Sequence, residues 1–167
     1  MNRHLTLVPL DEDPDLPAIR ATLTGAGLEW GHGILLRTPE GATPVIGGDP
    51  LSFEVSWLGD GARSFYGQIH DSALNPAQCA LIHRLATRGN LLLAPDSGPP
   101  QLVVCGGTHE AEDVHDESAP PWLEVVCFVD TPEQLHEALH GGWPTYRSTF
   151  LDSGTVWGPK ERWPDFG

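Results

Sequence analysis

Two pairs of side chains in this sequence have the spacing of metal ligands. Cys105 and His109 are four residues apart, at the end of an expected strand and in the glycine loop that follows it. His136 and His140 are also four apart, and on a helix this spacing projects both rings from neighbouring turns of one side. Zinc accepts one thiolate and three imidazoles as a ligand set. These residues define one hypothesis, a zinc-dependent hydrolase or metal-binding protein. In the alternative interpretation, both helix histidines are exposed to solvent and Cys105 is buried.

The segment from Cys105 to His109, Cys-Gly-Gly-Thr-His, resembles a short motif in the editing domain of alanyl-tRNA synthetases. In that family a cysteine and a histidine four residues later bind zinc, together with an earlier His-x-x-x-His pair. The resemblance therefore implies zinc ligation by Cys105 and His109. Here the His-x-x-x-His pair, His136 and His140, follows the cysteine segment instead of preceding it. The similarity covers five contiguous residues and the remaining family pattern is absent, so no family membership follows from it.

The second chemical feature is charge, because 23 carboxylates stand against 9 cations and the formal net charge is −14. No lysine or arginine occurs between Arg88 and Arg147, and we call this segment the cation-free stretch. Its ten carboxylates are Asp96, Glu110, Glu112, Asp113, Asp116, Glu117, Glu124, Asp130, Glu133 and Glu137. The negative electrostatic field of these carboxylates repels nucleic acid and anionic lipid and attracts cationic partners. The charge therefore argues against nucleic acid or a membrane as partner and favours a basic protein.

The densest part of the cation-free stretch lies between residues 109 and 117. It contains Glu110, Glu112, Asp113, Asp116 and Glu117. It lacks the His-Glu-x-x-His spacing of zinc proteases and the alternating oxygen ligands of a calcium loop. Two interpretations stay open: a solvated loop that maintains solubility, or a partner-binding patch with Trp122 as its aromatic anchor. The second gives the leading hypothesis, an acidic protein-binding module that needs no cofactor and is similar in composition to immunity proteins and nucleic-acid mimics.

Nucleophilic and phosphate chemistry have little support in the sequence. It contains neither a Gly-x-Ser-x-Gly turn nor a phosphate-binding loop with its lysine. Cys79 and His83 are four residues apart on an expected helix, but Leu81, Ile82 and Leu85 indicate packing at that position. A binding protein is therefore favoured over an enzyme.

Length and composition predict one domain spanning residues 1–167. A chain of 167 residues can bury a core without disulfides, and a hydrophobic fraction of 40% argues against disorder. The three cysteines, at widely spaced apolar positions, are expected to be reduced and buried. No apolar run approaches the roughly 20 residues that cross a bilayer, and the N-terminus lacks the pattern of a secretory signal. The expected location is the cytoplasm.

The hydrophobic pattern predicts an α+β fold: a mixed, mainly antiparallel sheet with about three helices packed on it. Strands are expected at residues 5–10, 28–36, 51–57, 64–69, 91–94, 102–105 and 122–129, with the second broken by Gly31 and Gly33. The clearest signal is the alternation of Leu51, Phe53, Val55 and Trp57 with polar residues, which predicts a hairpin with the following strand and a buried apolar face. The apolar segment 122–129 is typical of a central strand covered on both faces.

Three helices are expected from their terminal signals. The first begins near Asp15, and the others begin at residues 75–78 and 131–134, where a capping side chain, a proline and a glutamine form a capping box. Gly89 and Gly141 are expected to end the second and third helices. The tail, residues 143–167, is rich in Trp and Phe and is expected to pack on the domain.

Overall fold

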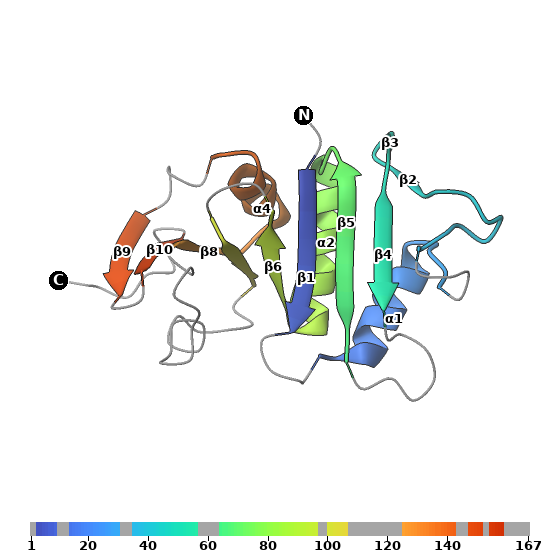
Figure 1. Cartoon of the computed structure of the whole chain (residues 1–167), viewed down its shortest axis with the longest axis horizontal. Coiled ribbons are helices and arrows are strands. Elements are labelled where there is room, and N and C mark those ends of the chain that lie inside the picture. The colour runs from blue at the N-terminus through green and yellow to red at the C-terminus, as the bar shows by residue number, and fades with distance from the viewer. Residues whose placement is uncertain are drawn as a thin grey trace.

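An eight-stranded sheet forms the centre of the computed structural model, with strand order β4-β5-β1-β6-β7-β8-β10-β9 (Figure 1). The structure describes residues 3–9, 14–30, 35–56, 64–96, 100–106 and 125–142, and for residues 147–151 and 154–157 the backbone alone, with Gly158 completing the last strand. The strands are β1 (Arg3–Pro9), β4 (Ser52–Ser56), β5 (Tyr66–Ser72), β6 (Leu91–Pro95), β7 (Leu102–Cys105), β8 (Val125–Val129), β9 (Arg147–Leu151) and β10 (Gly154–Gly158). The β7–β8 and β8–β10 pairs are parallel, and the other neighbours are antiparallel. The predicted α+β class and mixed, mainly antiparallel sheet are confirmed.

Three helices of the described residues, α1 (Leu16–Gly25), α2 (Pro76–Gly89) and α4 (Pro132–Leu139), pack on one face of the sheet (Figure 1). One row of residues in matched register crosses six strands on that face: Val55, Gly67, Leu7, Leu93, Val103 and Cys127. All six are buried, and the five side chains of this row belong to the same core cluster as Ile19, Ile82 and Leu135 of the helices. The main core therefore lies between the helices and this face.

The helix start signals are confirmed in detail. Asp15 caps α1, with its carboxylate accepting the Ala18 N–H at 3.1 Å. Capping boxes begin α2 at Asn75 and α4 at Thr131. These side chains satisfy backbone N–H groups that have no partner within the helix.

Helix α2 ends at Gly89 as predicted, although glycine is not its left-handed residue. The left-handed residue is Asn90, with φ of 61°, whereas Gly89 is the last helical residue. Glycine is required at position 89 for another reason, because a Cβ there would lie 2.5 Å from Ile19 Cγ1. Gly89 therefore permits close contact between α2 and α1. At the end of α4, Gly141 does adopt the left-handed region, with φ of 87°.

The predicted hairpin is confirmed by the antiparallel pairing of β4 with β5, in which Phe53 faces Ile69 and Val55 faces Gly67. Leu51, Phe53 and Val55 are buried in the main core as expected. Trp57 and the predicted turn at 59–61 lie outside the described residues.

The strand predicted at 28–36, broken at Gly31 and Gly33, is observed as isolated bridges. Glu29 and Arg37 form one antiparallel bridge, and Leu35 forms another with Glu54. The predicted break falls at residues 31–34, which lie outside the described residues. Leu28 and Leu36 are both buried in the core, which explains the apolar signal at these positions.

Two features were not predicted as strands. A small hairpin of β2 (Val45–Ile46) and β3 (Asp49–Pro50) contacts the start of α2, where the Asn75 amide donates to Ile46 O and Asp49 Oδ2, both at 2.9 Å. In the tail, β9 and β10 extend the sheet through the β8–β10 pairing.

Candidate functional site

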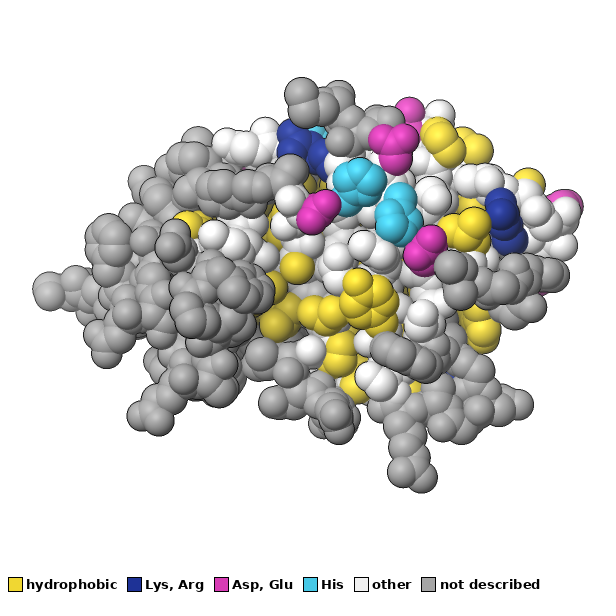
Figure 2. Space-filling model, in the orientation of Figure 1, with side chains coloured by type: hydrophobic (Ala, Val, Ile, Leu, Met, Phe, Trp, Pro, Cys, Tyr) yellow, Lys and Arg dark blue, Asp and Glu magenta, His cyan; other side chains and the backbone are white. Residues whose placement is uncertain are grey.

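Polar side chains gather on the face of β4, β5 and β1 that the helices leave uncovered, which we call the open face. Figure 2 shows two histidines side by side on this face with acidic side chains around them. The two are His4 of β1 and His70 of β5, whose ring centroids lie 5.8 Å apart in an edge-to-face arrangement. They are accessible because alternate residues of each strand point away from the core.

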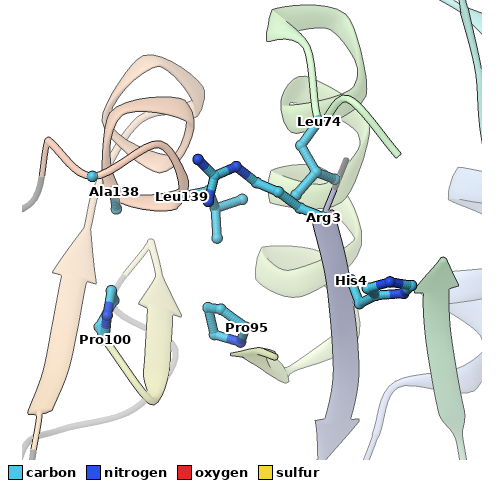
Figure 3. Close-up of a pocket in the computed structure, with 8 residues that line it drawn as sticks. Arg3, His4, Leu74, Pro95, Pro100, Ala138 and Leu139 are labelled. Carbon is cyan, nitrogen blue, oxygen red and sulfur yellow. The ribbon is translucent and has the colours of Figure 1, made fainter. Parts of the chain in front are cut away.

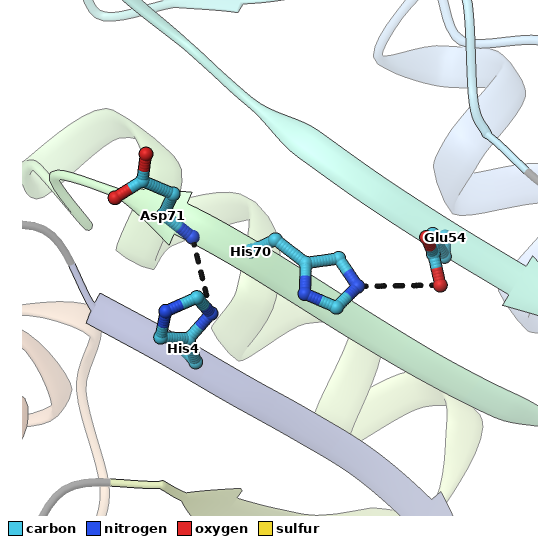
Figure 4. A network of polar contacts seen from close by, with 4 residues as sticks. All are labelled: His4, Glu54, His70 and Asp71. Atoms are coloured by element: carbon cyan, nitrogen blue, oxygen red, sulfur yellow. Dashed lines mark hydrogen bonds and ion pairs between the residues drawn. The ribbon is translucent and has the colours of Figure 1, made fainter.

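The histidines are held by polar contacts from two neighbouring residues (Figure 4). The Asp71 N–H donates to His4 Nδ1 at 3.3 Å, so in this arrangement the ring proton of neutral His4 lies on Nε2. His70 Nε2 lies 3.2 Å from Glu54 Oε2. Both side chains are about one-third exposed, so this contact, which is an ion pair only when His70 is protonated, is partly screened by solvent.

A β-bulge creates this arrangement. Arg3 is in register with Ser72 and Leu5 with Ile69, so His70 and Asp71 together oppose the single residue His4. Asp71 has a positive φ of 50°, the left-handed conformation that aspartate tolerates better than most residues. The bulge therefore places two β5 residues beside one β1 histidine.

Asp96, at the end of β6, completes the group, because its backbone N–H donates to His4 O at 3.2 Å. We call His4, Glu54, His70, Asp71 and Asp96 the open-face cluster. Three carboxylates make it predominantly acidic, and its imidazoles add hydrogen-bonding groups. Its chemistry suits the binding of a positively charged or hydrogen-bond-donating surface.

The described part of the cation-free stretch also exposes its carboxylates. Asp96, Asp130, Glu133 and Glu137 are all exposed, the last three at the beginning of α4 and along its outer side. The six predicted partner-binding residues, Glu110, Glu112, Asp113, Asp116, Glu117 and Trp122, lie outside the described residues. Their role stays a prediction.

The structure describes three of the four predicted zinc ligands. His136 and His140 are adjacent, with ring centroids 4.2 Å apart and the rings stacked. His140 Nδ1 lies 2.8 Å from His136 O and His140 Nε2 lies 3.1 Å from Ala73 O, so both nitrogens face backbone carbonyls. Burial, and then the charge of His140, lower the pKa of His136.

Cys105 is fully buried at the end of β7, and His109 lies outside the described residues. Within the described ranges, no group of three or more His, Cys, Asp or Glu side chains is arranged to hold a metal ion. With His109 undescribed, the zinc hypothesis stays a prediction that rests on spacing.

The three cysteines are buried, as predicted, and none forms a disulfide. Burial raises the pKa of the Cys79 and Cys127 thiols to about 12, with Glu137 adding to the effect at Cys127. Burial also lowers the pKa of His83. A neutral thiol is a weak nucleophile, so the Cys79 and His83 pair has no features of an activated catalytic pair.

The open-face cluster was not predicted from the sequence. One signal was present, since the alternation of the 51–57 strand placed Glu54 opposite Phe53 and Val55. The β1–β5 register and its bulge bring His4 and His70 together, and neither follows from local spacing.

The chain matches no family model, and comparison with curated proteins and with solved structures gave no match. Among the described helices, none is long and apolar enough to cross a membrane.

Proposed function

We propose that the protein is a cytosolic binding module that recognises a basic protein by charge complementarity. The observation that carries the proposal is the cation-free stretch, with ten carboxylates and no lysine or arginine between Arg88 and Arg147. A surface of one sign accelerates the encounter with an oppositely charged partner and disfavours partners of the same sign.

The described surface supports this proposal at two places. Asp130, Glu133 and Glu137 are exposed along α4, and the open face adds Glu54 and Asp71. We assign the principal contact to Glu110, Glu112, Asp113, Asp116 and Glu117, with Trp122 as the aromatic anchor. In such interfaces a buried aromatic side chain contributes most of the affinity while the surrounding charges steer the encounter. Immunity proteins and nucleic-acid mimics are binding modules of this chemical kind.

The test is capture of partners from a lysate of the source organism with three forms of the protein. The wild type is compared with a loop variant, E110Q/E112Q/D113N/D116N/E117Q, and with a charge-matched control, D11N/E12Q/D13N/E40Q/D60N. Each variant removes five of the 23 carboxylates and changes the net charge from −14 to −9. The control positions all lie outside the cation-free stretch.

We expect the wild type and the control to retain the same basic protein at moderate salt, and the loop variant to lose it. If all three forms retain the same proteins with the same salt dependence, the acidic segment 109–117 is not an interface. Equal loss from both variants would show that total charge, rather than this segment, determines binding.

A further inference from the structure

A small cavity lies between the beginning of β1 and the end of α4 (Figure 3). Its volume is about 150 Å³. Two of the residues that line it, Arg3 and His4, are basic, and the others are Leu74, Pro95, Pro100, Ala138, Leu139 and Gly141. Figure 3 shows the Arg3 side chain extending across the cavity towards Leu139, whereas the His4 ring points towards β5. The cavity therefore combines apolar side chains with one guanidinium.

The Arg3 side chain has no partner that would explain its position. Its Nε is buried and makes no hydrogen bond. No ion pair joins Arg3 to a carboxylate of the described residues, although the chain has 23 carboxylates for 9 cations. A buried donor without an acceptor loses its hydration with no compensation. An acceptor bound in the cavity would remove this cost.

The neighbouring backbone does not supply that acceptor. The C-terminal end of α4 borders the cavity at Gly141, and two carbonyls of its last turn already accept local hydrogen bonds. The His140 N–H donates to His136 O at 3.1 Å, and the Gly142 N–H donates to Glu137 O at 2.7 Å. Arg3 Nε therefore has no acceptor among the described residues, and a bound ligand would supply one.

We propose that this cavity binds a small carboxylate with a short apolar tail, whose two oxygens pair with the Arg3 guanidinium. The planar guanidinium fork matches a carboxylate in a bidentate geometry. Leu74, Pro95 and Leu139 provide apolar surface for the tail, which is the usual division of roles in a small-molecule pocket. A water molecule occupies about 30 Å³ in the liquid, so the cavity of about 150 Å³ fits an acid with a few carbon atoms.

The experiment is calorimetric titration of the full-length protein with isobutyrate as the probe. Isobutyramide keeps the shape without the charge, and inorganic phosphate keeps the charge without the tail. We expect saturable binding of isobutyrate at one site, with both comparison ligands weaker by about tenfold or more, since a hydrogen bond to a charged group contributes roughly this factor.

Substitutions of Arg3 assign the binding to this cavity. We expect Arg3→Gln to weaken isobutyrate binding about tenfold or more, and Arg3→Lys to weaken it less because the charge remains without the fork. Arg84→Gln is the matched control, since it removes the same charge from an exposed position on α2. Its affinity should equal that of the wild type.

Several results would overturn the proposal: no binding of isobutyrate by the wild type, equal binding by wild type and Arg3→Gln, or equal weakening in Arg84→Gln. Phosphate or isobutyramide binding as tightly as isobutyrate would also contradict the assigned ligand class. Circular dichroism melts establish that each variant is folded, and the ligand comparison on the wild type does not depend on any variant.

Discussion

The two halves of the sheet differ in how their faces are covered. In β4, β5 and β1, buried residues alternate with half-buried or exposed ones, and the open face carries Glu54, Gln68, His70 and Thr6. In β6, β7 and β8 most residues on both faces are buried. Leu92, Val104 and Phe128 are in register on the face opposite the helices and are at most 6% exposed. We call these the alternating half and the doubly buried half.

The difference shows where this fold can place chemistry. A strand buried on both faces has no position for a charged side chain without a large desolvation cost. The alternating half does have such positions, and the open-face cluster occupies them. In the doubly buried half, the polar groups of the described residues lie at the strand ends and on α4, as Asp96, Asp130 and Glu133 do.

The largest expected effect concerns the buried face of the alternating half. Phe53 is fully buried, so Phe53→Ala should lower the free energy of unfolding by about 3–5 kcal/mol through loss of packing and formation of a cavity. Ser56→Ala, on the opposite face of the same strand, should change it by no more than about 0.5 kcal/mol. Urea melts measure both, and nearly equal effects would mean that the assigned buried face is wrong.

The second prediction compares the two halves on the face opposite the helices. Leu92→Ala should lower the free energy of unfolding by about 2–5 kcal/mol, because Leu92 is only 2% exposed. Thr6→Ala, on the same face but in the alternating half, should change it by no more than about 0.5 kcal/mol. Chemical denaturation of both variants tests the comparison directly. A small effect of Leu92→Ala would show that this face is not packed in the doubly buried half.

The third and smallest effect is a pH dependence at His83, between α2 and the start of α4. Burial lowers its pKa more than the Asp130 carbonyl and the charges of Glu133 and Asp130 raise it. As the pH falls below about 6.5, the unfolded chain therefore binds more protons at this histidine than the folded chain does. The contribution of His83 to the free energy of unfolding is fully present above its usual pKa of 6.5. This contribution is lost as the pH falls below that value.

Replacement of His83 by glutamine should reduce this dependence. Thermal melts at a series of pH values between about 7 and about 5 should show a smaller loss of stability in His83→Gln than in the wild type. His136, whose pKa is also lowered, changes stability in the same direction and is retained in both proteins. Identical pH profiles would contradict the prediction.

The parts of the fold that could be predicted from the sequence are those that depend on local segments. The hairpin and the capped helices follow from local chemistry, since the alternation around Phe53 and the Asn75 and Thr131 capping boxes are contained in short segments. In the segment 28–36 the apolar signal comes from Leu28 and Leu36, which both contribute to the core, whereas the described backbone pairs only through isolated bridges. The spacing of apolar residues alone does not distinguish a continuous strand from separate buried residues in an irregular segment.

The open-face cluster depends on contacts between residues far apart in the chain. His4 and Asp71 are 67 positions apart, and they meet because of the β1–β5 register and its bulge. A shift of one residue in that register would turn His70 into the core. Arg3 could not be identified as a cavity residue either, because β1, β6 and α4 together form that cavity.

In our proposal, the acidic segment 109–117, rather than total charge, determines partner binding. The most direct measurement is the association rate of the captured basic protein with the wild type, the loop variant and the charge-matched control over a range of salt concentrations. We expect the loop variant to associate about tenfold or more slowly at low salt, with a weaker salt dependence, while the control stays close to the wild type. Equal rates and equal salt dependence for the two variants would contradict the claim.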